Sequence, residues 1–266
     1  MKPKVCVLRV DGINCDEELF YAFGKYGGAP EYVHVNELRD KSKKLKDFQI
    51  LAIPGGFAYG DDVVSGKILA TELVSFLKDQ IKTFVKNKGF VLGICNGFQV
   101  LVRTGLLPFN HLGTMDATLV QNESGHFECR FIKIKIEKSK AKFLDPYVGQ
   151  TIDIAVNHGE GKFYALPQDL KKVEKEDLVF CRYIDQKSSP TQKYPQNPNG
   201  SLNAIAGITD PAGHIIGLMP HPEKIVEYTQ HPNWRRVMIG KGGPALRSLG
   251  AGGFIFESMI KFAQQS

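Results

Sequence analysis

Short apolar runs alternate with amphipathic stretches through the first part of the chain. The runs 4–10, 31–35 and 48–53 are typical of buried strands. The segment 11–27 passes from a turn into an amphipathic helix, and 69–86 has the apolar spacing of a helix. Strands that alternate with helices in this way are typical of a mostly parallel sheet with helices on both faces. The pattern therefore predicts a doubly wound, flavodoxin-like α/β domain whose functional loops follow the carboxyl ends of the parallel strands.

The pattern changes after residue 119, where the apolar runs become short and alternating. Residues 127–137 and 151–159 alternate as expected for antiparallel strands, and 185–201 is rich in Pro, Asn and Ser, as a loop would be. Two further strands, 203–210 and 214–220, are predicted on either side of a turn. We therefore expect antiparallel strands to be added to the parallel core.

Length and composition favour a single domain. The chain has 266 residues, 42% of them hydrophobic, which is enough to bury a sizeable core. A glycine-rich tract precedes a predicted C-terminal helix at 254–263. We expect one domain over 1–266, with a loop-rich extension at about 231–253.

Charge and cysteine content argue against several classes of protein. The net charge of +6 comes from lysines scattered among acids, densest at 39–48, with no basic motif interleaved with aromatic residues, so no nucleic-acid partner is predicted. No apolar run approaches the roughly 20 residues of a membrane span. The five cysteines are widely spaced and form no C-x-x-C pair, so neither disulfides nor a metal site is predicted. We expect a soluble cytoplasmic protein.

The run 90–102 contains the strongest candidate for catalysis. An apolar strand at 90–92 leads to Cys95, and an apolar-faced helix follows. Gly93 and Gly97 lie two residues before and two residues after Cys95, which is the spacing of a sharp strand-to-helix turn with an exposed nucleophile. The helix N-terminus behind the sulfur would favour the thiolate. A lone free cysteine is more often a small buried hydrophobe, but two glycines at this spacing favour the nucleophile.

A nucleophilic cysteine needs a base and a group that orients the base. His221 follows a predicted buried strand, lies between two prolines and has Glu223 two residues later, so it is the preferred base. His158, in a glycine-rich segment, is its chief rival.

Two features could donate hydrogen bonds to an oxyanion. The N–H of Asn96 follows the nucleophile, and the loop after the strand at 48–53 contains Gly55 and Gly56, whose backbone can approach a substrate closely. A Gly-Gly pair after a strand is by itself more often an ordinary turn. Together with the cysteine and histidine motifs, the pair indicates acyl-transfer chemistry.

These motifs, in this order, resemble those of the class I glutamine amidotransferases, whose Cys-His-Glu triad hydrolyses glutamine and passes ammonia on. The resemblance is strongest to the glutaminase subunits of phosphoribosylformylglycinamidine synthase, an enzyme of purine biosynthesis, and it covers most of the chain. The segments that carry it are GINCDEE (12–18), PGGFAYGDD (54–62), GICNGFQVL (93–101), QNESGHFECRF (121–131), NHGEGKF (157–163), YPQNPNGSLNAIAGI (194–208) and GLMPHPE (217–223).

The resemblance implies a role for each matching residue. The triad would consist of Cys95 as nucleophile, His221 as base and later acid, and Glu223 as the residue that orients His221. The residues that would contact glutamine or its oxyanion are Gly55, Gly56, Asn96, Gln99, Asn122, Ser124 and Phe127.

The resemblance also implies partners. Ammonia would pass to a large synthetase subunit, and a small accessory subunit would complete the enzyme. No cofactor is expected in this chain, which has no G-x-x-x-x-G-K-[ST] loop, and ATP and Mg²⁺ are expected on the synthetase. The alternatives are a glutaminase subunit for another acceptor, an elbow-type cysteine peptidase, and a non-catalytic regulatory subunit that keeps the fold. The presence of Cys95, His221 and Glu223 together argues against the last.

Overall fold

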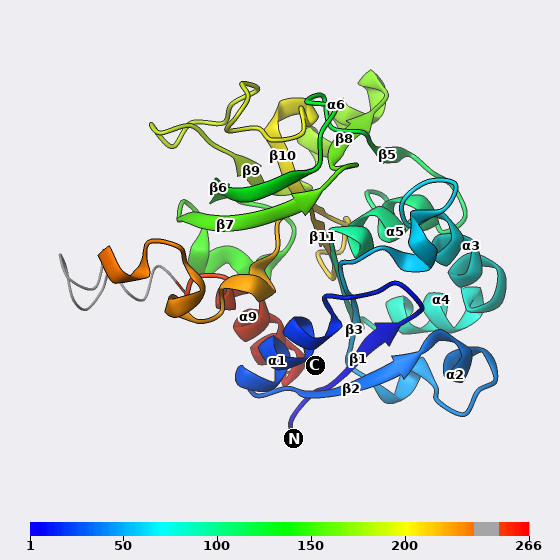
Figure 1. Ribbon diagram of the computed structural model, residues 1–266. Helices are drawn as coiled ribbons and strands as arrows, with labels where there is room; N and C mark the ends of the chain where they lie inside the picture. The colour runs from blue at the N-terminus through cyan, green and yellow to red at the C-terminus, as the bar shows by residue number, and fades with distance from the viewer. Residues whose placement is uncertain (237–249, 266) are drawn as a thin grey trace.

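The computed structural model describes residues 1–236 and 250–265 (Figure 1). Most of the predicted extension at 231–253 falls on residues 237–249, which lie outside the described residues. Within the described ranges, no helix is long and apolar enough to cross a membrane.

One half of the main sheet is parallel and carries the functional loops. In spatial order its strands are β2 (Ala29–His34), β1 (Lys4–Arg9), β3 (Ile50–Ile53), β4 (Phe90–Ile94) and β11 (Ile215–Leu218). Every residue of β3, β4 and β11 is buried, because helices cover both faces, and these strands are therefore continuously apolar. The prediction of parallel strands near 4–10, 31–35 and 48–53 is confirmed.

The other half of the sheet is antiparallel. It continues from β11 through β10 (Ile205–Thr209), β9 (Val179–Tyr183), β6 (Glu128–Ile136) and β7 (Thr151–His158). The direction reverses at the turn between β10 and β11, where the N–H of Gly213 donates to the carbonyl of Asp210 at 3.0 Å. The strands predicted at 127–137 and 151–159 are confirmed, and they form the added antiparallel part.

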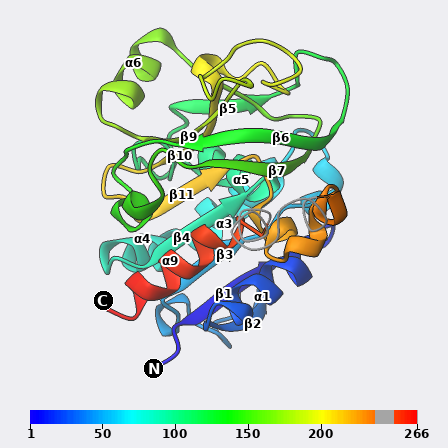
Figure 2. The same ribbon diagram turned by 90° about the vertical axis from the view of Figure 1, so that its left-hand side faces the viewer.

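Helices cover both faces of the parallel half, as predicted (Figures 1 and 2). One layer contains α1 (Asp16–Lys25) and α9 (Gly253–Ala263), which meet at the rings of Phe23 and Phe256, 5.1 Å apart. The opposite layer contains α3 (Lys67–Phe76), α4 (Lys78–Lys86) and α5 (Asn96–Thr104). The single helix predicted at 69–86 is two helices, because the backbone leaves the helical conformation at Leu77 (φ −113°, ψ 6°).

Several short elements were not predicted. They are α2 (Val35–Arg39), α6 (Pro167–Lys175), β9, and a separate antiparallel pair formed by β5 (Ala117–Val120) and β8 (Lys162–Ala165). In Figure 1 this pair and α6 lie at the top of the molecule, apart from α1 and α9. The segment 185–201 is free of helix and strand, as predicted, but Asn197, Asn199 and Ser201 at its end are buried.

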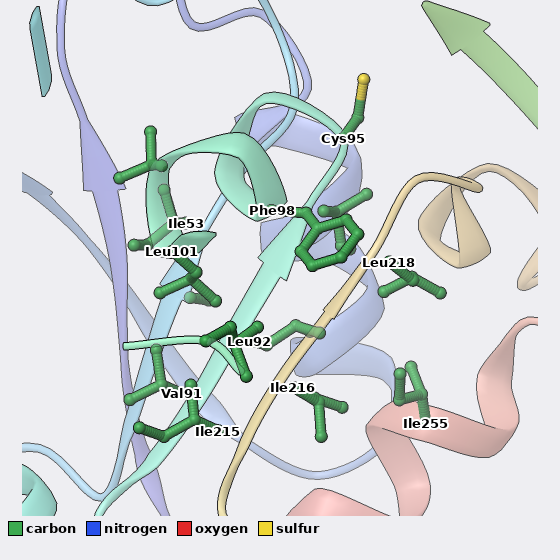
Figure 3. Close-up of a cluster of buried hydrophobic side chains, with 14 of the residues drawn as sticks. Ile53, Val91, Leu92, Cys95, Phe98, Leu101, Ile215, Ile216, Leu218 and Ile255 are labelled. Atoms are coloured by element: carbon green, nitrogen blue, oxygen red, sulfur yellow. The ribbon is translucent and has the colours of Figure 1, made fainter. Parts of the chain in front are cut away.

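The core surrounds β4 and α5 and supports one reactive position. Figure 3 shows Phe98 and Leu101 of α5 packed among side chains of β3, β4 and β11, while the sulfur of Cys95 points away from this cluster. Phe98 is 1% exposed and Leu101 is fully buried. Dense packing on the rear of the turn therefore fixes the position from which Cys95 projects.

Candidate active site

Cys95 lies on a sharp turn between β4 and α5. Its backbone has φ 52° and ψ −105°, a strained conformation for a residue with a side chain. The turn is possible because its neighbours are glycines: a Cβ on Gly97 would lie 2.0 Å from the carbonyl oxygen of Ile53, and one on Gly93 would lie 2.5 Å from that of Gly97. The predicted strand–turn–helix around Cys95 is confirmed, but the prediction of an exposed side chain is wrong: Cys95 is 5% exposed, because its sulfur is covered by the segment that contains Asn157, to whose carbonyl it donates at 3.4 Å.

His221 lies beside Cys95 because β4 and β11 are neighbouring parallel strands. Ile94 pairs with Leu218, so the residues that follow both strands leave the same edge of the sheet. A Cβ on Gly55 would lie 2.8 Å from Cε1 of His221 and 3.4 Å from Cβ of Cys95, so both side chains meet at this glycine. The backbone N–H of His221 donates to the carbonyl of Ala155 at 2.8 Å and fixes the loop.

Glu223 holds the imidazole from the opposite side. Its Oε1 lies 2.5 Å from Nδ1 of His221, and each of the two residues is only 1% exposed. The Nε2 atom of His221 and the Oε2 atom of Glu223 are buried without a hydrogen-bond partner among the described residues. The ring is therefore oriented through Nδ1, and Nε2 is left for the reaction.

The charges around His221 favour its protonated form. Burial by itself lowers the pKa of His221, but the carboxylate of Glu223 and the neighbouring Cys95 raise it, and the resulting pKa lies well above the usual 6.5. A proton taken from the Cys95 thiol is therefore well held by the imidazole.

His158 has a different environment from His221. It is 3% exposed, and its Nδ1 lies 3.1 Å from Oδ1 of Asn122. Burial, and next the positive charge of His221, lower the pKa of His158 to about 3. Its Nε2 lies 3.4 Å from Nδ2 of Asn199, so both ring nitrogens have partners. His158, the alternative base considered from the sequence, is therefore a neutral residue that links its own loop to those of Asn122 and Asn199.

The loop at 54–57 is fastened to the segment 12–15. The N–H of Phe57 donates to the carbonyl of Gly12 at 2.9 Å, and the N–H of Cys15 donates to that of Gly55 at 3.2 Å. Between these two bonds Gly56 has φ +138°, which only glycine adopts without strain. Asn96 begins α5, where helical N–H groups have no partner within the helix. The use of the backbone N–H groups of Gly56 and Asn96 as oxyanion donors stays a prediction.

Two of the residues expected to contact glutamine have polar side chains that are already engaged. Gln99 is 3% exposed; its Nε2 donates to the carbonyl of Glu160 at 2.7 Å, and its Oε1 accepts from Nδ2 of Asn96 at 3.0 Å. The Nδ2 of Asn122 donates to the carbonyl of His158 at 2.8 Å, and its Oδ1 accepts from the N–H of Gly161 at 2.9 Å. These side chains hold the loop at 158–161 in place, and their contact with glutamine stays a prediction.

Ser124 and Phe127 lie nearer the surface. The Oγ of Ser124 accepts from the N–H of His126 at 3.3 Å. Phe127 is 52% exposed, and its ring lies 6.3 Å from that of Phe57, which is itself 44% exposed and follows the predicted oxyanion loop. The two rings therefore join the loops at 54–57 and 121–131 across the surface.

Cys15 was not among the site residues expected from the sequence, but the structure places it at the site. Cys15 is 5% exposed and interacts with His221. A Cβ built on Gly55 would lie 3.5 Å from the Sγ atom of Cys15. The position of Cys15 in GINCDEE, one of the motifs of the resemblance, was the available signal. Cys15 therefore lies beside the proposed base.

The fold and this site define a glutamine amidotransferase. Residues 2–263 match the family described as the CobB/CobQ-like glutamine amidotransferase domain, and the chain belongs to this family.

Within it, the chain belongs with the PurQ proteins. It is 41% identical to phosphoribosylformylglycinamidine synthase subunit PurQ of Dehalococcoides mccartyi over 99% of both chains. It is also 41% identical to PurQ of Picrophilus torridus, over 90% of this chain and 94% of that one. A solved structure of PurLQS from Thermotoga maritima matches with a TM-score of 0.73 and 29% identity, covering 98% of this chain and 99% of that one.

Proposed function

We propose that the chain hydrolyses glutamine to glutamate and ammonia through a thioester on Cys95. The sulfur of Cys95 attacks the side-chain carboxamide carbon after its proton has passed to Nε2 of His221. The N–H groups of Gly56 and Asn96 hold the negative oxygen of the tetrahedral intermediate. The intermediate collapses when His221 returns the proton to the leaving nitrogen, and ammonia departs.

A water molecule completes the reaction. The neutral imidazole of His221 removes a proton from this water, which attacks the thioester carbonyl; glutamate leaves and Cys95 is regenerated. Glu223 holds the ring in one orientation and stabilises the imidazolium in both steps. The observation that carries this proposal is the strained turn at Cys95, which lies next to a buried His221–Glu223 pair with a 2.5 Å contact.

The ammonia is proposed to go to an ATP-dependent synthetase that makes phosphoribosylformylglycinamidine in purine biosynthesis. Support comes from the PurQ relatives, and from the PurLQS structure for a large synthetase and a small accessory subunit as partners. ATP and Mg²⁺ are placed on the synthetase in this proposal. All five cysteines are free thiols, which supports a reducing compartment such as the cytoplasm.

Cys95→Ala tests the chemistry. The variant, assembled with its synthetase, should release no glutamate and should make no product from glutamine, yet it should still use added ammonium, because only the ammonia source is lost. Cys129→Ala is the matched control, since Cys129 is exposed and lies outside the triad, and it should retain glutamine-dependent synthesis. A Cys95→Ala variant that still hydrolyses glutamine would end the proposal and would favour a non-catalytic role for the thiol.

A further inference from the structure

Asp61 lies in a strained segment between the predicted oxyanion loop at 54–57 and α3. Tyr59, Asp61 and Val63 have φ of 56°, 54° and 73°, in the left-handed region that residues with side chains seldom adopt. Such conformations persist only where surrounding contacts hold them. The path of this segment is therefore fixed by specific interactions.

The carboxylate of Asp61 supplies several of these interactions. Its Oδ2 accepts from Oγ of Ser65 at 3.0 Å, and its Oδ1 accepts from the N–H of Gly66 at 3.3 Å. The same Oδ1 accepts from Nδ2 of Asn96 at 2.8 Å, which is the shortest of the three bonds. One carboxylate therefore joins the strained segment to the first residue of α5.

The side chain of Asn96 continues the connection to the oxyanion loop. Asn96 is 1% exposed, and its Oδ1 accepts from the N–H of Ala58 at 3.4 Å. Ala58 lies two residues after Gly56. The chain of contacts from Asp61 through Asn96 to Ala58 therefore links the two segments that carry the proposed oxyanion donors, the N–H groups of Gly56 and Asn96.

We propose that Asp61 is a positioning residue that holds these two oxyanion donors at the right separation and orientation. It acts through Asn96 and not on glutamine itself. The oxyanion develops only after Cys95 has attacked, so a displaced donor lowers kcat and leaves KM nearly unchanged. The inference rests on the proposed function, which assigns the two N–H groups to the oxyanion.

Asp61→Ala, assembled with the synthetase and assayed for glutamate release, tests the role. Its kcat should fall about 100-fold, the effect of a misplacement of about 1 Å, and its KM should stay within about threefold of the wild-type value. Asp62→Ala is the matched control, because Asp62 is the exposed neighbour in the same segment, and it should keep the wild-type kcat. An unchanged kcat in Asp61→Ala, or an equal loss in Asp62→Ala, would overturn the proposal.

Two conservative variants separate geometry from charge and also decide the matter if Asp61→Ala does not fold. Asp61→Asn keeps an oxygen for Asn96 and adopts positive φ more readily than most residues. It should stay within about tenfold of the wild-type kcat, because a charge-assisted hydrogen bond is only about twice as strong as a neutral one. Asp61→Glu keeps the charge but adds a methylene that displaces Asn96, so its kcat should lie below that of Asp61→Asn. The opposite order would show that charge and not position matters, and would overturn the proposal.

The contact between Asp61 and Asn96 is tested without any activity measurement. In the full chain made with isotope-labelled asparagine, the side-chain amide signal of Asn96 should shift in Asp61→Ala and keep its position in Asp62→Ala. An unmoved signal in Asp61→Ala would overturn the contact. If the wild type releases no glutamate, the proposed function fails and the role of Asp61 in the reaction fails with it, whereas glutamate release with an unchanged kcat in Asp61→Ala overturns the role of Asp61 alone.

Discussion

Replacing Gly97 with alanine should displace the nucleophile without altering any group that takes part in the reaction. The new Cβ would lie 2.0 Å from the carbonyl oxygen of Ile53, where ordinary contacts begin at 3.4 Å. The start of α5 must therefore move away from β3 by about 1.4 Å, the difference between these distances. Backbone atoms lie on both sides of the contact, so no side chain can rotate to relieve it.

The size of the effect follows from this displacement. A misplacement of about 1 Å costs about 100-fold in rate, which corresponds to about 2.7 kcal/mol of activation free energy. Overpacking lowers the free energy of unfolding by about 1–3 kcal/mol. A typical domain has a free energy of unfolding of about 5–15 kcal/mol, so the loss is tolerable. The variant should therefore fold and lose about 100-fold in kcat/KM for glutamine.

Glutamate release and urea unfolding, measured on the same preparation, check both numbers. Gly24→Ala is the matched control: it lies in α1, and its Cβ would be 3.8 Å from the nearest atom, on Pro30. This variant should keep its activity and gain about 0.5–1 kcal/mol of stability. Full activity and stability in Gly97→Ala would refute the close contact between the turn and β3.

Three further predictions concern charge and reactivity. Glu223→Ala removes the carboxylate that raises the pKa of His221 and leaves the effect of burial, which lowers this pKa. The alkaline limb of the kcat/KM profile should therefore move to lower pH, and kcat/KM should fall about 100-fold. An unshifted alkaline limb would contradict the pairing of Glu223 with His221. The pKa of His158 is about 3 in the folded chain, whereas its ordinary value is 6.5. As the pH falls, this histidine therefore takes up a proton in the unfolded chain before it does so in the folded chain. Urea unfolding should therefore show that the wild type loses about 2 kcal/mol more than His158→Gln between pH 7 and pH 5, and equal losses would contradict the buried neutral ring. A glutamine-like electrophile should alkylate Cys95 before the other cysteines, because the proposed reaction sets Cys95 against the substrate carboxamide and gives its proton to His221; burial alone does not separate it from Cys15, since both are 5% exposed. Mass spectrometry of the labelled peptides decides this, and equal labelling of all five thiols would count against an activated Cys95.

The sequence by itself determined the first strands of the parallel half of the sheet and the turn at Cys95, whereas the parallel pairing of β11 with β4 came from the structure. Fully buried strands such as β3 and β4 are continuous apolar runs, and a sharp turn needs glycines at fixed spacing, so both features are local and can be read along the chain. His221 and Glu223 were also found locally, because two residues of spacing suffice for their contact.

Only the tertiary structure decided the elements and contacts that depend on distant segments. The four-residue strands β5 and β8 stabilise each other across more than forty residues, and neither has a strong pattern alone. Gln99 and Asn122 have engaged side chains because the loop at 158–161 folds back onto them. Cys15 reaches His221 because the hydrogen bonds between segments 12–15 and 54–57 place it beside the end of β11, and no spacing along the chain encodes a contact between residues so far apart.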